Sequence, residues 1–221
     1  MEDGSMHHRG TLELFHYWTQ QRAGRRAPKR ADISPAGISA VLGNTFILEG
    51  NGAHANFRLA GTRLCNAFGK ELRGTALPDL FAPRDRLLLS KSITAVSGGK
   101  NIIVGETVAE AACDKQVSME MLLMPLSDDN IRMLGSLHFL QSPYWLGSAP
   151  LRNMQLIALK HADPDRELVS LANRPPVMLP SHMSDDLRPR MWHIVDGGRS
   201  NGTAPTERTG NLSLISGGKT D

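Results

Sequence analysis

Three extended apolar segments, over residues 101–112, 116–126 and 131–141, dominate the middle of the chain. Asp114 and Lys115 separate the first two segments, and the sequence SDDN separates the second from the third. Separators this short favour antiparallel strands joined by tight turns. The three segments therefore predict consecutive strands of one antiparallel sheet.

The second of these segments alternates between two kinds of side chain. Met119, Met121 and Leu123 fall on one face of the expected strand. Ser118, Glu120 and Leu122 fall on the other face, because successive strand residues point to opposite sides of a sheet. This alternation predicts a half-buried strand whose methionines fill the core.

A helix precedes the sheet segments near the start of the chain. Leu12, Phe15 and Trp18 recur at helical spacing, which predicts an amphipathic helix over 11–23 with an aromatic face. Such a face needs a surface to cover it, so Phe15 and Trp18 are candidates for contact with a second copy or a partner. The chain's own sheet is the alternative surface.

Two short strands and further helices fill the region between this helix and residue 101. The dipeptide Asn51-Gly52 predicts a turn that joins strands 45–50 and 56–61. A helix is expected over 83–96, ended by two glycines. Its buried side is expected to include Leu87, Leu88, Ile93 and Val96.

The order of these elements predicts an α+β fold. We expect a five-stranded antiparallel sheet with short helices on one face, preceded by the N-terminal amphipathic helix. Residues 151–163 fit either a further strand or a short helix. The expected organisation is a disordered N-terminus (1–10), a domain (11–164) and a largely disordered tail (165–221) without sustained periodicity.

Composition and charge exclude several classes of partner. The net charge of +3 on 221 residues is too small to indicate a nucleic-acid binder, and we interpret the basic run over 22–30 as a solvated connector. No apolar run reaches the length of a membrane helix, and no secretory signal is visible, so we expect a cytoplasmic protein. Cys65 and Cys113 lack CxxC spacing and are expected as free thiols rather than a disulfide.

Two sequence stretches carry a family resemblance. The first is RADISPAGISAVLGNTFILE, with Arg30, Asp32, Ile33 and Pro35 in the pattern R-x-D-I-x-P. The second is FRLAGTRLCNAFGKELRG, which runs from 57 to 74 and fits the pattern F-R-x-x-G-T-x-L-x-x-x-F-G-x-x-L-x-G. Together with the aromatic first helix, these stretches resemble a bacterial family of stand-alone PAS-domain proteins over roughly residues 11–160. Some motility- and cell-cycle-regulating proteins look like this chain.

The resemblance implies a sensory or regulatory role in bacterial signalling. PAS domains sense small ligands or dock onto proteins, so the expected partners are a signalling protein or a second copy, in a homodimer. A pocket between sheet and helices is expected to be lined by Leu64, Phe68, Leu72, Leu80, Ile103 and Phe139. The alternative is a ligand-free adaptor that uses the sheet face and tail, where RMWHIV (190–195) forms an apolar island.

Motifs of catalysis and cofactor binding are missing from the sequence. It holds no P-loop, no HExxH, no GxSxG and no paired CxxC, so we expect neither an enzyme nor a resident cofactor or metal. The neighbours of Cys65 do not match those of flavin photosensors, and His138 alone does not indicate haem. Glu106 and Glu110 share one strand face, which we expect to be largely solvated.

Overall fold

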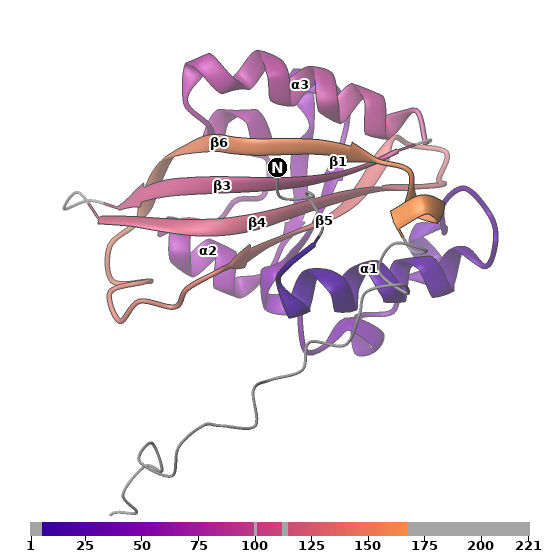
Figure 1. Cartoon of the computed structure of the whole chain (residues 1–221), viewed down its shortest axis with the longest axis horizontal. Helices are drawn as coiled ribbons and strands as arrows, with labels where there is room; N and C mark the ends of the chain where they lie inside the picture. Colours follow the sequence, from indigo (N-terminus) through magenta and orange to yellow (C-terminus); the bar gives the residue numbers. More distant parts are fainter. Residues whose placement is uncertain (1–5, 100, 112–114, 168–221) are drawn as a thin grey trace, which may run out of the picture. The chain divides into compact units, whose positions relative to one another are not determined.

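The three apolar segments are the strands β3 (Ile102–Ala111), β4 (Lys115–Leu126) and β5 (Arg132–Phe139), as predicted. The structure is a computed structural model, and it describes residues 6–99, 101–111 and 115–167. β1 (Thr45–Glu49) and β2 (Asn56–Ala60) complete the five predicted strands. The strand order is β2-β1-β5-β4-β3-β6, with every pairing antiparallel (Figure 1). The α+β fold with an N-terminal helix is confirmed.

A sixth strand, β6 (Leu151–Ala162), extends the sheet beyond β3. The sequence left this segment open between strand and helix. The pairing with β3 shifts register twice, between Glu106 and Thr107 and between Val108 and Glu110. Each shift breaks the alternation of side chains along the strand. The period of two that identifies a strand is therefore interrupted within β6.

Helices cover both faces of the sheet. The helices α2 (Thr62–Phe68) and α3 (Pro83–Ser97) lie over the inner face with the short helix η5 (Leu77–Leu80). The helix α1 (Arg9–Arg22) packs against β4 and β5 on the outer face. Figure 1 shows α1 and α3 well apart, with the strands running between them. The helices that follow β2 therefore share one face of the sheet, and α1, which precedes the sheet, covers the opposite face.

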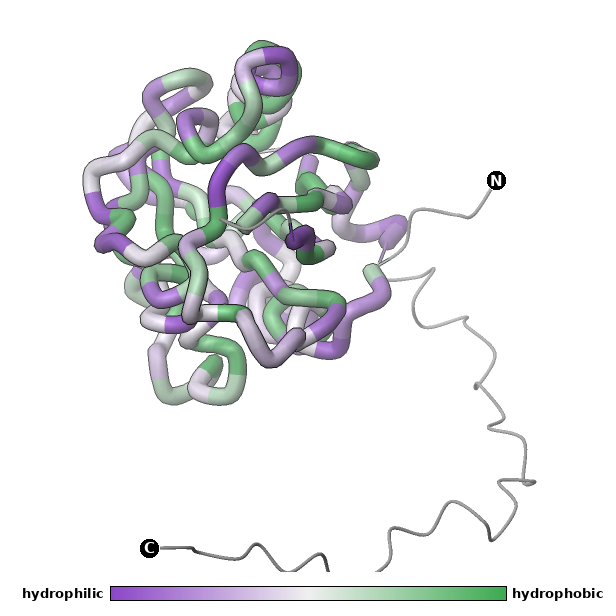
Figure 2. The backbone as a smooth tube through the Cα atoms, turned by 90° about the vertical axis from the view of Figure 1, so that its left-hand side faces the viewer, coloured by the Kyte–Doolittle hydropathy of each residue, from purple (hydrophilic) through white to green (hydrophobic). Residues whose placement is uncertain are grey.

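The segment between α1 and β1 also lies on the outer face. It holds three turns of 3-10 helix: η1 (Arg30–Asp32), η2 (Pro35–Ile38) and η3 (Leu42–Asn44). With α1 they form the second apolar core of the domain, which includes Leu122 and Met124 of β4. β4 is therefore buried on both faces, not half-buried as predicted. Hydrophobic and hydrophilic stretches alternate along the chain trace in Figure 2.

The ends of the domain differ from the predicted boundaries. Met6 is buried, and α1 begins at Arg9 with His8 as its N-cap, two residues before the predicted start of the helix. Residues 165–167 belong to a helical turn after β6. The rest of the predicted disordered tail, including the apolar island at 190–195, lies outside the described residues. So does Cys113, whereas Cys65 is a free thiol.

The buried side of α3 is rotated from the predicted one. Leu89, Ile93 and Val96 are buried, whereas Leu87 is 67% exposed and Leu88 54% exposed. The run of three leucines allowed either set, and the sheet contacts the set at helical spacing from Ile93. Among the described residues, no helix is long and apolar enough to cross a membrane.

Candidate functional site

The structure gathers the six predicted pocket residues in one apolar core between the sheet and α2 and α3. None of them is more than 8% exposed, and they pack together with other side chains of that core. Phe139 also lines a more polar hollow beside α2. That the set binds a ligand therefore stays a prediction. The set comprises Leu64, Phe68, Leu72, Leu80, Ile103 and Phe139.

Phe15 and Trp18, the predicted partner residues, are fully buried within their own chain. Both belong to the outer-face core, and the Trp18 indole N–H donates to the carbonyl of Pro125 on β4 at 2.9 Å. The surface that covers the aromatic face is therefore the chain's own sheet, the alternative that the sequence left open. Neither side chain offers an exposed contact surface.

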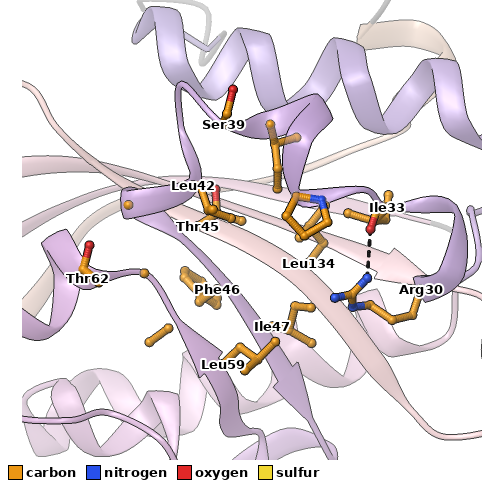
Figure 3. Close-up of a pocket in the computed structure, with 15 residues that line it drawn as sticks. Arg30, Ile33, Ser39, Leu42, Thr45, Phe46, Ile47, Leu59, Thr62 and Leu134 are labelled. Carbon is orange, nitrogen blue, oxygen red and sulfur yellow. Dashed lines mark hydrogen bonds between the residues drawn. The ribbon is translucent and has the colours of Figure 1, made fainter.

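A separate pocket of about 460 Å³ opens on the outer face, which we call the outer-face pocket (Figure 3). Its floor includes Ile47 of β1 and Leu134 of β5, and its opposite wall is the segment from Arg30 to Gly43. Leu42 and Leu59 stand on its rim, 42% and 49% exposed. The size lies within the range of small-molecule sites. The remaining lining residues are Ile33, Pro35, Ile38, Ser39, Thr45, Phe46, Ala60, Gly61 and Thr62.

Both stretches that carry the family resemblance contribute to this pocket. Arg30, Ile33 and Pro35 come from the first stretch, and Gly61 and Thr62 come from the second. Sequence reasoning interpreted Arg30 as part of a solvated connector and the other residues as parts of turns and helix starts, and it missed their convergence. The only available signal was that two separate parts of one pattern carried them.

The wall from Arg30 to Gly43 is fixed at its start by polar contacts. The Asp32 carboxylate accepts the Arg25 guanidinium at 2.8 Å and the Lys29 backbone N–H at 2.9 Å. These two contacts, the Arg25 contact first, lower the pKa of Asp32. The Arg30 backbone N–H donates to Asp128 at 3.0 Å, and the Ser34 N–H donates to the Tyr17 hydroxyl at 2.9 Å. The wall is thereby tied to both α1 and the β4–β5 connection.

The far end of the pocket closes where α2 meets the sheet. The Gly61 N–H donates to the Thr45 carbonyl at 2.8 Å. A side chain at position 61 would overlap the carbonyl oxygens of Leu42 and Gly43. Glycine is required here because the two backbones approach so closely. The Thr45 hydroxyl donates to the Val41 carbonyl at 2.9 Å, which holds the same turn.

A buried polar cluster lies under the start of α1. The Glu120 carboxylate accepts the backbone N–H groups of His7 and His8 at 2.7 and 3.1 Å, and its side chain is 1% exposed. Glu106, its cross-strand neighbour, is exposed as predicted. Burial, then the charges of His8 and Arg63, lowers the pKa of His138 to about 4. Within the described residues, the hydroxyls of Thr11 and Ser136 and the His138 Nε2 have no hydrogen-bond partner.

Metal chemistry has no obvious place in the described part of the chain. Over residues 6–99, 101–111 and 115–167, no group of three or more His, Cys, Asp or Glu side chains could hold a metal ion. The Cys65 thiol lies 3.7 Å from the Glu71 carboxylate in the hollow beside α2.

Comparison with known proteins gives the family. Residues 6–138, more than half of the chain, match the family described as PAS domain. The chain belongs to this family, whose domains are typical of sensory and regulatory signalling proteins. No curated protein matches the sequence. A solved structure of the PAS domain of an HTR-like protein from Haloarcula marismortui is similar at 15% identity and a TM-score of 0.35. The match covers 48% of this chain and 90% of that one.

Proposed function

We propose that this chain is a cytoplasmic regulatory protein of bacterial signalling, which binds a small ligand in the outer-face pocket and acts on a partner protein or a second copy of itself. The convergence of both resemblance stretches on that pocket carries the proposal. The pocket has an apolar body with few polar groups, the usual character of a small-molecule site.

The segment that follows α1 connects the pocket to α1, through which a bound ligand would affect a partner. Ile33 and Ile38 line the pocket and also pack in the same apolar core as Phe15 and Trp18 of α1. An occupant that displaces these isoleucines therefore changes the packing of α1 on the sheet. Because packed cores shift between discrete arrangements, this contact couples occupancy to the position of the helix.

Native mass spectrometry of the full-length chain, purified from its own host, tests the proposal. We expect a stoichiometric non-covalent adduct. The adduct should be lost in Leu59→Trp, which fills the rim of the pocket, and kept in Leu88→Trp, a matched change at an equally exposed leucine on α3. A bare chain that also shows no thermal shift with nucleotides, flavin, haem or organic acids contradicts the proposal.

A ligand-free adaptor is the second candidate function. The observation in its favour is the adjacent pair Leu87 and Leu88 on α3, which leaves apolar surface exposed. Under this alternative, the chain is bare in native mass spectrometry. Cross-linking to a host protein is then lost in Leu87→Ser and unchanged in Leu59→Trp. The opposite pattern favours the ligand-binding function.

A further inference from the structure

The outer-face pocket has a charged end. Arg30 lines it, and the Arg30 guanidinium donates through one Nη1–H to the Ile33 carbonyl at 2.8 Å. Figure 3 shows this contact and places Arg30 on the opposite side of the view from Thr62. The contact leaves the remaining N–H donors of the guanidinium available, because arginine carries five in a planar fork.

Arg30 differs from several other arginines of the domain. Arg25, Arg58 and Arg132 each form an ion pair with a carboxylate. Among the residues that the structure describes, no carboxylate lies within ion-pair distance of the Arg30 guanidinium. The Asp128 carboxylate near its backbone is oriented by the Arg30 N–H and by Arg132. A half-buried cation with no anion beside it favours an anionic ligand.

The rest of the pocket is suited to an aliphatic body. Ile33, Ile38, Ile47 and Leu134 present branched aliphatic side chains toward the space, and the exposed rim leucines extend the apolar surface outward. Burying an aliphatic chain against these groups is favourable in proportion to the area removed from water. The hydroxyls of Ser39 and Thr62 are the small polar groups at the end away from Arg30.

We infer that the outer-face pocket binds a free aliphatic carboxylate. The carboxylate of the ligand lies on the Arg30 guanidinium, and its hydrocarbon tail lies against Ile47 and Leu134. The inference rests on the proposed function, since it names the ligand class of the same pocket. A carboxylate takes two parallel N–H donors from one arginine, which fixes the head group at one end. The hydrocarbon tail of the ligand then also lies near Ile33 and Ile38, the isoleucines that pack in the same core as α1.

Isothermal titration calorimetry on the full-length chain tests the head group, with decanoate and 1-decanol as probes of equal chain length. In Arg30→Gln, we expect the Kd of decanoate to rise about tenfold and that of 1-decanol to change less than about twofold. Arg30→Lys keeps the positive charge but loses the planar fork, so the Kd of decanoate should rise, by less than in Arg30→Gln. Arg26→Gln, an equal loss of charge at an arginine outside this pocket, should leave both Kd values unchanged.

The site of binding is tested with the rim variants. Leu59→Trp should abolish binding of both probes, and Leu88→Trp should preserve it. Binding that survives Leu59→Trp would place the ligand elsewhere and overturn the inference. A second outcome would also overturn the inference: a Leu59→Trp chain that binds neither probe and changes from dimer to monomer in light scattering. The pocket would then be an interface between two copies of the chain.

The failures of the two proposals are distinguishable. If Arg30→Gln weakens both probes equally, or neither, the carboxylate assignment is wrong while the pocket remains a ligand site. If neither probe binds the parent chain, the aliphatic carboxylate is wrong as a class. The adduct in native mass spectrometry, and its loss in Leu59→Trp, then decide the proposed function independently.

Discussion

The imidazole ring of His8 lies flat on that of His138, with ring centroids 4.5 Å apart and ring planes 15° apart. His8 is the N-cap of α1, and its Nδ1 accepts the Gly10 N–H at 3.0 Å. His138 lies on β5 and is 3% exposed. The stacked pair therefore joins the first turn of the helix to the outer face of the sheet. We expect the stability of the domain to depend on this junction.

Acidification should destabilise the domain through His138. Its pKa is lowered from 6.5 to about 4, mainly because the ring is buried. As the pH falls below 6.5, the unfolded chain takes up a proton at His138 while the folded chain does not, so the free energy of unfolding decreases until about pH 4. The full effect is roughly 3 kcal/mol. Urea unfolding at about pH 7.5, 5.5 and 4.5 measures it.

The control for this prediction is His138→Phe. Phenylalanine keeps an aromatic ring against His8 and cannot take up a proton. The variant should lose less stability than the parent over the same pH interval, whatever its stability at neutral pH. Equal slopes in the two proteins would show that His138 is not the titrating group.

Gly10→Ala should destabilise the domain, against the usual helix preference. Alanine is favoured over glycine within a helix by up to about 1 kcal/mol. A Cβ at Gly10 would overlap the His138 ring, which is buried and has little room to move. Overpacking of this kind costs about 1–3 kcal/mol, so the clash should outweigh the helix preference.

A double-mutant cycle identifies the source of that cost. In a His138→Ala background the ring is gone, and Gly10→Ala should then be neutral or stabilising. Urea denaturation of the four proteins gives the coupling free energy between the two positions. A cost of Gly10→Ala that is the same in both backgrounds would rule out the ring contact as its origin.

Glu120 should hold residues 6–8 on the sheet. Its carboxylate accepts two backbone N–H groups from the segment before α1, and it is buried. Glu120→Leu leaves those donors without their acceptor, which should cost about 1–3 kcal/mol, and Glu120→Gln should cost less. Hydrogen exchange at the His7 and His8 amides should accelerate before exchange in β4 does.

Glu106→Gln is the matched control, because Glu106 is the exposed cross-strand neighbour of Glu120. It should change the free energy of unfolding by less than about 0.5 kcal/mol. If the Glu106 and Glu120 variants lose similar stability, the general negative charge of the strand pair matters, and the contact with the N-terminal segment does not.

The strands were predictable because their signals are local. Alternation placed Met119 and Met121 on one face of β4 and Glu120 on the other, and the structure agrees. The alternation of side chains does not predict which helices or loops cover each face of the sheet. The Trp18 indole reaches the Pro125 carbonyl, a residue 107 positions away, and this contact buries the face that was expected to be solvated.

The outer-face pocket could not be predicted from the sequence, because residues far apart in the sequence form it. Its walls come from 30–43, 59–62, three residues of β1 and Leu134 of β5, which only the folded chain brings together. The pattern residues Arg30, Gly61 and Thr62 were visible, but each has an adequate local explanation: Arg30 in a solvated basic run, Gly61 in a turn and Thr62 in a helix cap. Leu64 and Phe68 lie in one apolar core, and their spacing on a single helix made that neighbourhood visible in the sequence.

Trp18 anchors α1 on the sheet. Since Trp18 is fully buried and its indole N–H donates to Pro125, Trp18→Phe should lose one buried hydrogen bond and cost about 1–2 kcal/mol. Trp18→Ala should cost about 3–5 kcal/mol because it also leaves a cavity. Urea unfolding measures both, and light scattering of the folded fraction should show no change in oligomeric state. A Trp18→Ala chain of parental stability that loses self-association would instead make α1 an interface.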